Sequence, residues 1–183
     1  MHIEANKFSA PCAVSHTTIA NYLSVLEETY AVNVLRPFNT YKKTEIVAAP
    51  KVYAFDTGFI CYYRGLHDIK SNELGQMWEH FVLNELQAHL QSRKIRYWRD
   101  KQGHEVDFII ERRGHAPIAM EAKWSSKNCD FTGLRVFLRQ YPNAKAFLVC
   151  NDLSKSIKKN IDGISVVYAG LKGFLHYITQ NSI

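Results

Sequence analysis

Residues 98–124, WRDKQGHEVDFIIERRGHAPIAMEAKW, decide the fold because two strand-like apolar runs within them carry charged residues. Side chains of a β-strand alternate between its two faces. If the runs pair through the turn RRGHA (112–116), Asp107 of the first run lies close to Glu121 of the second, with Lys123 on the same face. Two carboxylates and an ammonium group are therefore expected to converge at one place on a hairpin.

The same alternation predicts how the first strand divides between its faces. One face is expected to carry Glu105, Asp107 and Ile109, and the other Val106, Phe108 and Ile110. In the second strand, Ala119, Glu121 and Lys123 are expected to lie opposite Ile118, Met120, Ala122 and Trp124.

An amphipathic helix is predicted before the hairpin, in QMWEHFVLNELQAHLQ (76–91). Its expected buried side comprises Phe81, Val82, Leu83, Leu86 and Leu90. Glu79 precedes Val82, Leu83 and Leu86 by helical spacings, so it belongs beside the apolar stripe. A carboxylate there is costly without a cation. A divalent metal ion or Lys123 is expected to compensate it.

The remaining C-terminal segments complete an alternation of helices and strands. Strands are predicted in KIRYW (94–98), AKAFLVCN (144–151) and GISVVYAG (163–170), and helices in FTGLRVFLRQY (131–141) and LKGFLHYIT (171–179). Lys155, Lys158 and Lys159 are expected on a solvated loop or helix face. Trp78 and Trp124 are expected to pack in the core.

The N-terminal part predicts a helix followed by a hairpin. Ser15 suits the N-cap of a helix over about 17–29, and AVNVLRPF (31–38) and PKVYAFD (50–56) predict two strands whose connecting tip carries Lys42 and Lys43. This order matches the second half of a winged helix-turn-helix, and the missing first half suggests either the tail of a longer protein or an open reading frame that begins late. The helix either contacts DNA through its polar face (His16, Thr17, Asn21 and Ser24) or packs against a neighbouring domain. Asp56-Thr57-Gly58 suggests an acidic phosphate site or, preferably, a turn that ends the hairpin, in which Asp56 bonds the backbone and Gly58 has positive φ.

Composition restricts the partners and the compartment. The 183-residue chain has 23 Lys and Arg against 17 Asp and Glu, a net charge of +6, which favours nucleic acid or reflects an ordinary basic surface. A basic cluster interleaved with Tyr97 and Trp98 suits either a phosphate backbone with base stacking or a solvated rim. Its members are Arg93, Lys94, Arg96, Arg99, Lys101, Arg112 and Arg113, of which the last five are the candidate contacts to nucleic acid. Four cysteines without metal or redox spacing indicate free thiols in a reducing cytoplasm. No apolar run is long enough to span a bilayer, so no membrane association is expected.

Phosphodiester hydrolysis is the chemistry that uses such a set of charges. Mg²⁺, or Mn²⁺ in its place, binds one or two carboxylates together with water and a substrate phosphate. Asp107 and Glu121 would be the ligands, Lys123 the catalytic cation, and Glu79 would bind a second ion or position the attacking water. The alternative is a surface hairpin with an ordinary cross-strand salt bridge.

Asp107, the triplet Glu121-Ala122-Lys123 and Glu79 on the preceding helix together resemble the PD-(D/E)XK superfamily of restriction-endonuclease-like folds, with Val106 in the place of the proline. The whole chain resembles the C-terminal region of prokaryotic AAA-type ATPases, through TIANYLSVLEETY, PKVYAFDTGF, GQMWEHFVLNEL, YWRDKQGHEVDFII and MEAKW. The resemblance implies an α/β fold: a partial winged-helix module at 10–66 and a nuclease-like domain with a mixed central sheet at 73–183.

The resemblance also implies function. It points to a metal-dependent endo- or exodeoxyribonuclease that works with an ATPase domain or subunit, or to a catalytically silent module for nucleic-acid binding or protein interaction. No phosphate-binding loop of the form G-x-x-x-x-G-K-[ST] occurs in the sequence. ATP hydrolysis is therefore not expected of this chain.

Overall fold

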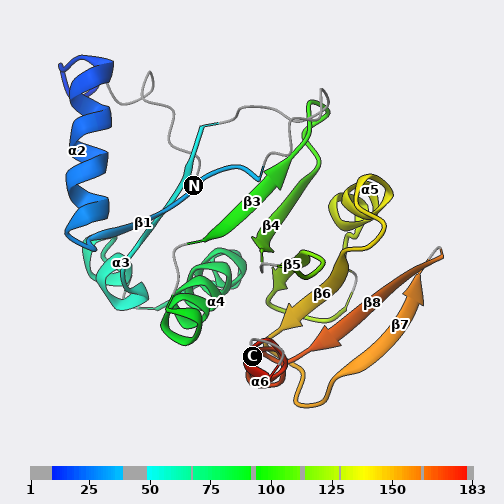
Figure 1. The fold of residues 1–183 in the computed structure, drawn as a ribbon. Coiled ribbons are helices and arrows are strands. Elements are labelled where there is room, and N and C mark those ends of the chain that lie inside the picture. Colours follow the sequence, from blue (N-terminus) through cyan, green and yellow to red (C-terminus); the bar gives the residue numbers. More distant parts are fainter. Residues whose placement is uncertain are drawn as a thin grey trace.

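A six-stranded mixed sheet forms the centre of the computed structural model, which describes residues 10–38, 49–66, 68–91, 94–111, 114–127, 129–161 and 163–180 (Figure 1). Its strand order is β3-β4-β5-β6-β8-β7. The strands are β3 (Ile95–Arg99), β4 (Glu105–Ile110), β5 (Ile118–Lys123), β6 (Lys145–Cys150), β7 (Ile157–Ile161) and β8 (Ile164–Ala169). β5, β6 and β8 run parallel, while β3 and β4 at one end and β7 at the other are antiparallel to their neighbours. The predicted α/β class with a mixed central sheet is confirmed.

Helices cover both faces of this sheet. Apolar side chains of α4 (Leu74–Leu90) and α6 (Leu171–Gln180) pack on one face, and those of α5 (Thr132–Gln140) pack on the other. In α4, Val82, Leu83 and Leu86 are buried as predicted. Phe81 is 41% exposed, so its predicted burial is wrong; it stacks beside Trp78 at the edge of the helix–sheet contact.

A second, two-stranded sheet precedes α4. Strands β1 (Val32–Leu35) and β2 (Lys51–Ala54) pair antiparallel, as the sequence predicts, and the tip with Lys42 and Lys43 lies outside the described residues. Before them, α2 (His16–Glu28) is capped by Ser15, whose hydroxyl accepts from the amide of Thr18. None of the side chains of α2 is buried in the described structure, and Figure 1 shows the helix standing away from the central sheet.

Two predictions about short segments are wrong. Asp56 does not end a hairpin turn: its carboxylate accepts from the amide of Phe59 and caps a helix, α3 (Thr57–Tyr63), in which Gly58 has no positive φ. Lys158 and Lys159 lie in strand β7, whose pairing with the apolar strand β8 overrides its polar composition. Trp78 is buried as predicted, but Trp124 is 39% exposed and touches Trp78 edge-on.

The N-terminal segment and the central sheet share one core. Leu35 of β1 and Tyr53 of β2 belong to the cluster that includes the buried side of α4. Backbone hydrogen bonds also join them, because the amide of Phe38 donates to Tyr97 of β3 and the amide of Tyr97 donates to Arg36. Residues 36–38 therefore run along the outer edge of β3, and β2 is held against α4 and β4.

Candidate active site

Strand β4 contains a β-bulge at Asp107. The pairs between β3 and β4 on either side of it are Arg96–Ile109 and Trp98–Val106. One residue of β3, Tyr97, therefore stands opposite two residues of β4, Asp107 and Phe108. An extra residue of this kind interrupts the alternation of a strand and turns a side chain into a new direction.

The bulge changes which side chains share a face of β4. Ile109 packs in the same core cluster as Val106, on the α5 side, while Phe108 and Ile110 pack on the α4 side. The predicted grouping of Asp107 with Ile109 is therefore wrong. In β5 the alternation is regular: Ala119 belongs to the α5-side cluster, and Ile118, Met120 and Ala122 to the α4-side cluster, as predicted.

The carboxylate of Asp107 lies at the place where β4 and β5 separate. Their register ends at the pair Phe108–Met120, and beyond it the amide of Ala122 donates to Asp107 Oδ2 at 3.1 Å. The other oxygen, Oδ1, is 3.7 Å from Lys51 Nζ. The side chain is 17% exposed. Asp107 thus bridges the backbone of β5 and the N-terminal segment while one edge remains open to solvent.

Burial and neighbouring negative charge act together on Asp107. Burial, together with the negative charges of Glu79 and Glu121, raises the pKa of this carboxyl to about 7, against the opposing effect of Lys51 and Lys123. Lys51 and Lys123 therefore do not fully offset the cost of a negative charge on Asp107. A divalent cation beside it would favour the ionised form.

Glu121 and Lys123 form a close pair on β5. Lys123 Nζ lies 2.7 Å from Glu121 Oε2. Glu121 is only 4% exposed, and burial raises the pKa of its carboxyl against the effects of Lys123 and of a hydrogen bond from the Leu134 amide. Burial alone would lower the pKa of Lys123, but Glu121 and Asp107 outweigh it, so the pKa of Lys123 is raised and the ammonium stays charged.

Gly133 explains how the amide of Leu134 reaches Glu121. A Cβ atom at position 133 would lie 1.8 Å from the carbonyl oxygen of Glu105 and 3.2 Å from Glu121 Oε1. Only glycine lets the first turn of α5 approach β4 so closely. The N-terminus of α5, with its partial positive charge, therefore faces a buried carboxylate.

Glu79 lies on the inner side of α4, as its spacing predicts, but its partners differ from those expected. Tyr53 Oη donates to Glu79 Oε1 at 2.5 Å, and Lys51 Nζ lies 3.4 Å from the same oxygen. The cation beside Glu79 is thus Lys51 and not Lys123, which pairs with Glu121. Burial and the charge of Glu79 raise the pKa of Tyr53 well above its usual range.

Lys51 is the site residue that sequence reasoning missed. Its side chain is 5% exposed and its ammonium contacts three carboxylates, those of Glu79, Glu105 and Asp107. Burial would lower the pKa of Lys51, but the three carboxylates raise it overall, so the group stays charged. Position 51 shares the buried face of β2 with Tyr53. The sequence did contain one indication of this role: Lys51 alternates with apolar residues at a position of β2 whose side chain is expected to face the core.

The carboxylate oxygens of Asp107 and Glu121 have the chemistry of a magnesium site, but the protein side chains that the structure describes do not enclose an ion on all sides. Oxygen ligands from Asp107 and Glu121 suit Mg²⁺, which usually takes only one or two carboxylates and keeps several waters. Within the described residues, no group of three or more His, Cys, Asp or Glu side chains is arranged to hold a metal ion. The residues therefore fit a cation bound largely through water and substrate, and not one enclosed by three protein carboxylates.

The basic residues predicted to contact nucleic acid differ in their distance from the acidic cluster and in their partners. Arg96 pairs with Glu111 at 3.1 Å, and Arg99 lies 3.9 Å from Glu105. Lys101 is exposed in the turn after β3, while Arg112 and Arg113 lie outside the described residues. Tyr97 and Trp98 are fully buried, so the idea that they stack on bases is wrong. His104, in the turn between β3 and β4, contacts Asp100 at 2.7 Å.

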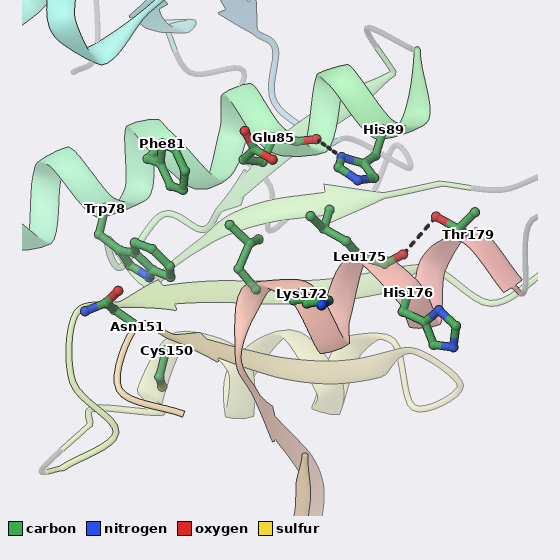
Figure 2. A pocket seen from close by; sticks show the side chains of 11 residues that line it. Trp78, Phe81, Glu85, His89, Cys150, Asn151, Lys172, Leu175, His176 and Thr179 are labelled. Carbon is green, nitrogen blue, oxygen red and sulfur yellow. Dashed lines mark hydrogen bonds between the residues drawn. The ribbon is translucent and has the colours of Figure 1, made fainter. Parts of the chain in front are cut away.

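Several pockets border α4, and two of them differ in their position relative to the site. One of about 570 Å³ includes Tyr53, Glu79 and His80 in its lining and so reaches the acidic cluster. Another, of about 700 Å³, lies between α4 and α6 and contains none of Asp107, Glu121 and Lys123 (Figure 2). The described helices include none long and apolar enough to cross a bilayer.

The fold and the site together define the class of this protein: it is a mixed α/β protein with a cluster of acidic side chains beside a β-bulge in its central sheet. The chain belongs to the family described as domain of unknown function DUF4143, whose model matches residues 74–169, more than half of the sequence. A second model, described as domain of unknown function DUF8612, matches residues 2–70. Lys51 thus comes from one matched segment, and Glu79, Asp107, Glu121 and Lys123 from the other.

Two curated relatives are similar to this chain. Uncharacterized protein Rv2008c of Mycobacterium tuberculosis and uncharacterized protein Mb2031c of Mycobacterium bovis are each 33% identical over 117 residues, which cover 62% of the chain and 26% of each relative. The chain therefore spans about a quarter of the length of these relatives. Among solved structures, a chain from the Thermococcus gammatolerans assembly of McrB AAA+ hexamers with bound McrC aligns with a TM-score of 0.39 and 12% identity, over 58% of this chain and 32% of that chain.

Proposed function

We propose that this chain is a Mg²⁺-dependent nuclease that hydrolyses phosphodiester bonds of DNA, with Mn²⁺ able to replace Mg²⁺. The observation that carries the proposal is the bulge that turns Asp107 toward β5, beside the pair formed by Glu121 and Lys123. The high pKa of Asp107 supports it, because an undercompensated carboxylate favours a cation. A restriction-endonuclease-like fold is part of the same proposal.

Each side chain has a distinct role in this reaction. Asp107 and Glu121 would hold the ion, and Mg²⁺ held there would supply an acidified water and neutralise charge that develops on the phosphate. Lys123 stabilises the phosphate or orients the attacking water as a compact positive charge. Glu79 is the auxiliary acidic residue behind Asp107. Arg96, Arg99, Lys101, Arg112 and Arg113 are the proposed contacts to the nucleic-acid backbone.

The partner and the compartment belong to the same proposal. The sequence resemblance to the C-terminal region of AAA-type ATPases supports an ATPase domain or subunit as the partner. The chain has no phosphate-binding loop of its own. We place this activity in the cytoplasm, where free thiols are stable.

The test is cleavage of labelled single-stranded, duplex, forked and four-way DNA with Mg²⁺, Mn²⁺ or EDTA. Metal-dependent cutting should be lost in Asp107→Asn and Lys123→Met and kept in Asp68→Asn and Lys145→Met, which change exposed residues outside the site. Loss of folding is monitored by circular dichroism. Cutting that survives in both site variants, or in EDTA, would refute the assignment.

A second function is favoured by the contacts of the carboxylates. Glu79, Glu105 and Asp107 pair with Lys51, and Glu121 pairs with Lys123, as in a site that keeps its shape without a metal. We propose as the alternative a catalytically silent module for nucleic-acid binding or protein interaction. In that case DNA binding weakens as salt rises but is unchanged by EDTA.

A further inference from the structure

Charge balance in the acidic cluster leaves room for a single divalent cation. Four carboxylates gather there, those of Glu79, Glu105, Asp107 and Glu121; two lysines contact them, and the more exposed Arg99 lies 3.9 Å from Glu105. With all of these groups ionised, the cluster carries a net charge of about −1, so one divalent ion already reverses its sign and a second would leave a large positive charge.

Lys51 and Lys123 contact different carboxylates of the cluster: Lys51 contacts Glu79, Glu105 and Asp107, and Lys123 contacts Glu121. The ammonium of Lys51 lies 3.7 Å from Asp107 Oδ1 and 3.4 Å from Glu79 Oε1. In centres that use two metals, the ions lie about 3.5–4 Å apart and share carboxylates. A cation that contacts Asp107 together with an auxiliary carboxylate has the position of such a second ion.

The protein holds Lys51 firmly in this place. The backbone of Lys51 pairs with Leu35 in the two-stranded sheet. Its Nζ lies 5.5 Å from the centre of the Tyr97 ring, and Tyr53, two residues along β2, donates to Glu79. The ammonium is thus fixed from β2, β3 and α4 together, in a position where it repels any further cation.

We infer that Lys51 is a built-in substitute for a second metal ion, so that the centre takes one divalent cation, between Asp107 and Glu121. Lys51 acts as a positioning residue, because it orients Asp107 and Glu79 without contacting substrate. The inference rests on the proposed metal-dependent nuclease for the first ion. It also makes the site composite: the segment matched by the second family model supplies one of its two lysines.

Counting bound ions in the full chain tests the inference without any measurement of cleavage. Mn²⁺ is titrated into the native chain, Lys51→Met, Lys51→Arg and the control Lys145→Met, and is followed by calorimetry and by the electron paramagnetic resonance of free Mn²⁺. We expect one ion in the native chain, Lys51→Arg and Lys145→Met, and a second ion in Lys51→Met. The same number of ions and the same affinity in Lys51→Met as in the native chain would overturn the inference.

The outcomes separate this inference from the proposed function. If the native chain binds no ion and Lys51→Met binds one, Lys51 does replace a cation, but the metal-dependent nuclease is refuted. If neither binds an ion, both are refuted. If Lys51→Met does not fold, Glu79→Gln decides: we expect one ion with affinity changed less than about tenfold, since Glu79 contacts Lys51 and not the ion. Loss of that ion would overturn the inference.

Discussion

Replacing Asp107 with asparagine should stabilise the metal-free protein, by an amount that grows as the pH rises from about 4 to 7 and is largest above about pH 7. The folded structure raises the pKa of this carboxyl from 3.8 to about 7. Because the folded pKa lies above the unfolded one, the contribution of Asp107 to stability is complete below about pH 4 and is lost as the pH rises through 7. Asparagine resembles the protonated form and can still accept from the amide of Ala122.

The size of this effect follows from the pKa difference. One pKa unit corresponds to about 1.4 kcal/mol, so ionisation of Asp107 costs the folded protein on the order of 4 kcal/mol above pH 7. Strain from the new amide group reduces the benefit, so we expect Asp107→Asn to raise the free energy of unfolding by about 2–4 kcal/mol at about pH 8. The difference should fall toward zero near pH 4.

Urea unfolding in EDTA across this pH range measures the effect. Asp68→Asn is the matched control, because Asp68 is exposed and its variant should stay within about 0.5 kcal/mol of the native chain. Saturating Mg²⁺ should stabilise the native chain and not Asp107→Asn. An Asp107→Asn variant that is less stable than the native chain at about pH 8, or whose advantage does not change with pH, would refute the electrostatic reasoning.

Gly133→Ala should destabilise the fold by about 2–3 kcal/mol or more in thermal unfolding, because its Cβ would overlap the carbonyl of Glu105. The control Gly75→Ala, whose Cβ would meet nothing within 4 Å, should be neutral or stabilising. Equal effects of the two substitutions would contradict the close approach of α5 to β4. Tyr53→Phe should cost about 1–3 kcal/mol in chemical unfolding, since it removes a hydrogen bond to a charged group; an unchanged midpoint would show that the bond contributes nothing. Lys101→Ala should weaken binding to DNA of any sequence and lower its salt dependence in fluorescence anisotropy, whereas Lys172→Ala, on the distant helix α6, should not; equal losses would place the DNA elsewhere.

Much of the central domain could be predicted because its elements have strong periodicity. Strands β4 and β5 carry apolar residues on both faces, as strands covered by helices on both sides do, and the stripe of α4 gives its inner side directly. The short helix α3 and the polar strand β7 were not predicted. Their own sequences favour turns and solvated loops, and only tertiary contacts decide their structure.

The site was harder to predict than the fold. The bulge in β4 cannot be recognised in the sequence EVDFII. Apolar residues occur at both odd and even positions, so a regular strand and a bulged strand would each place apolar side chains in the core. The sequence therefore indicates Asp107 as a candidate but not the direction of its side chain. Lys51 lies far along the chain from the other site residues, and only the packing of β2 against α4 brings it to Glu79.

The two outer strands of the central sheet also differ in how they meet solvent. Residues 36–38 cover β3, whereas β7 is an exposed edge that carries two neighbouring lysines, Lys158 and Lys159. Lys159 folds over the ring of Tyr168, with its Nζ 4.1 Å from the ring centre, and Lys158 is exposed. Positive charge on an unpaired edge discourages further strands from adding to it. Both edges of the sheet are thus protected from pairing with other chains: residues 36–38 cover β3, and the charges of Lys158 and Lys159 repel strands that approach β7.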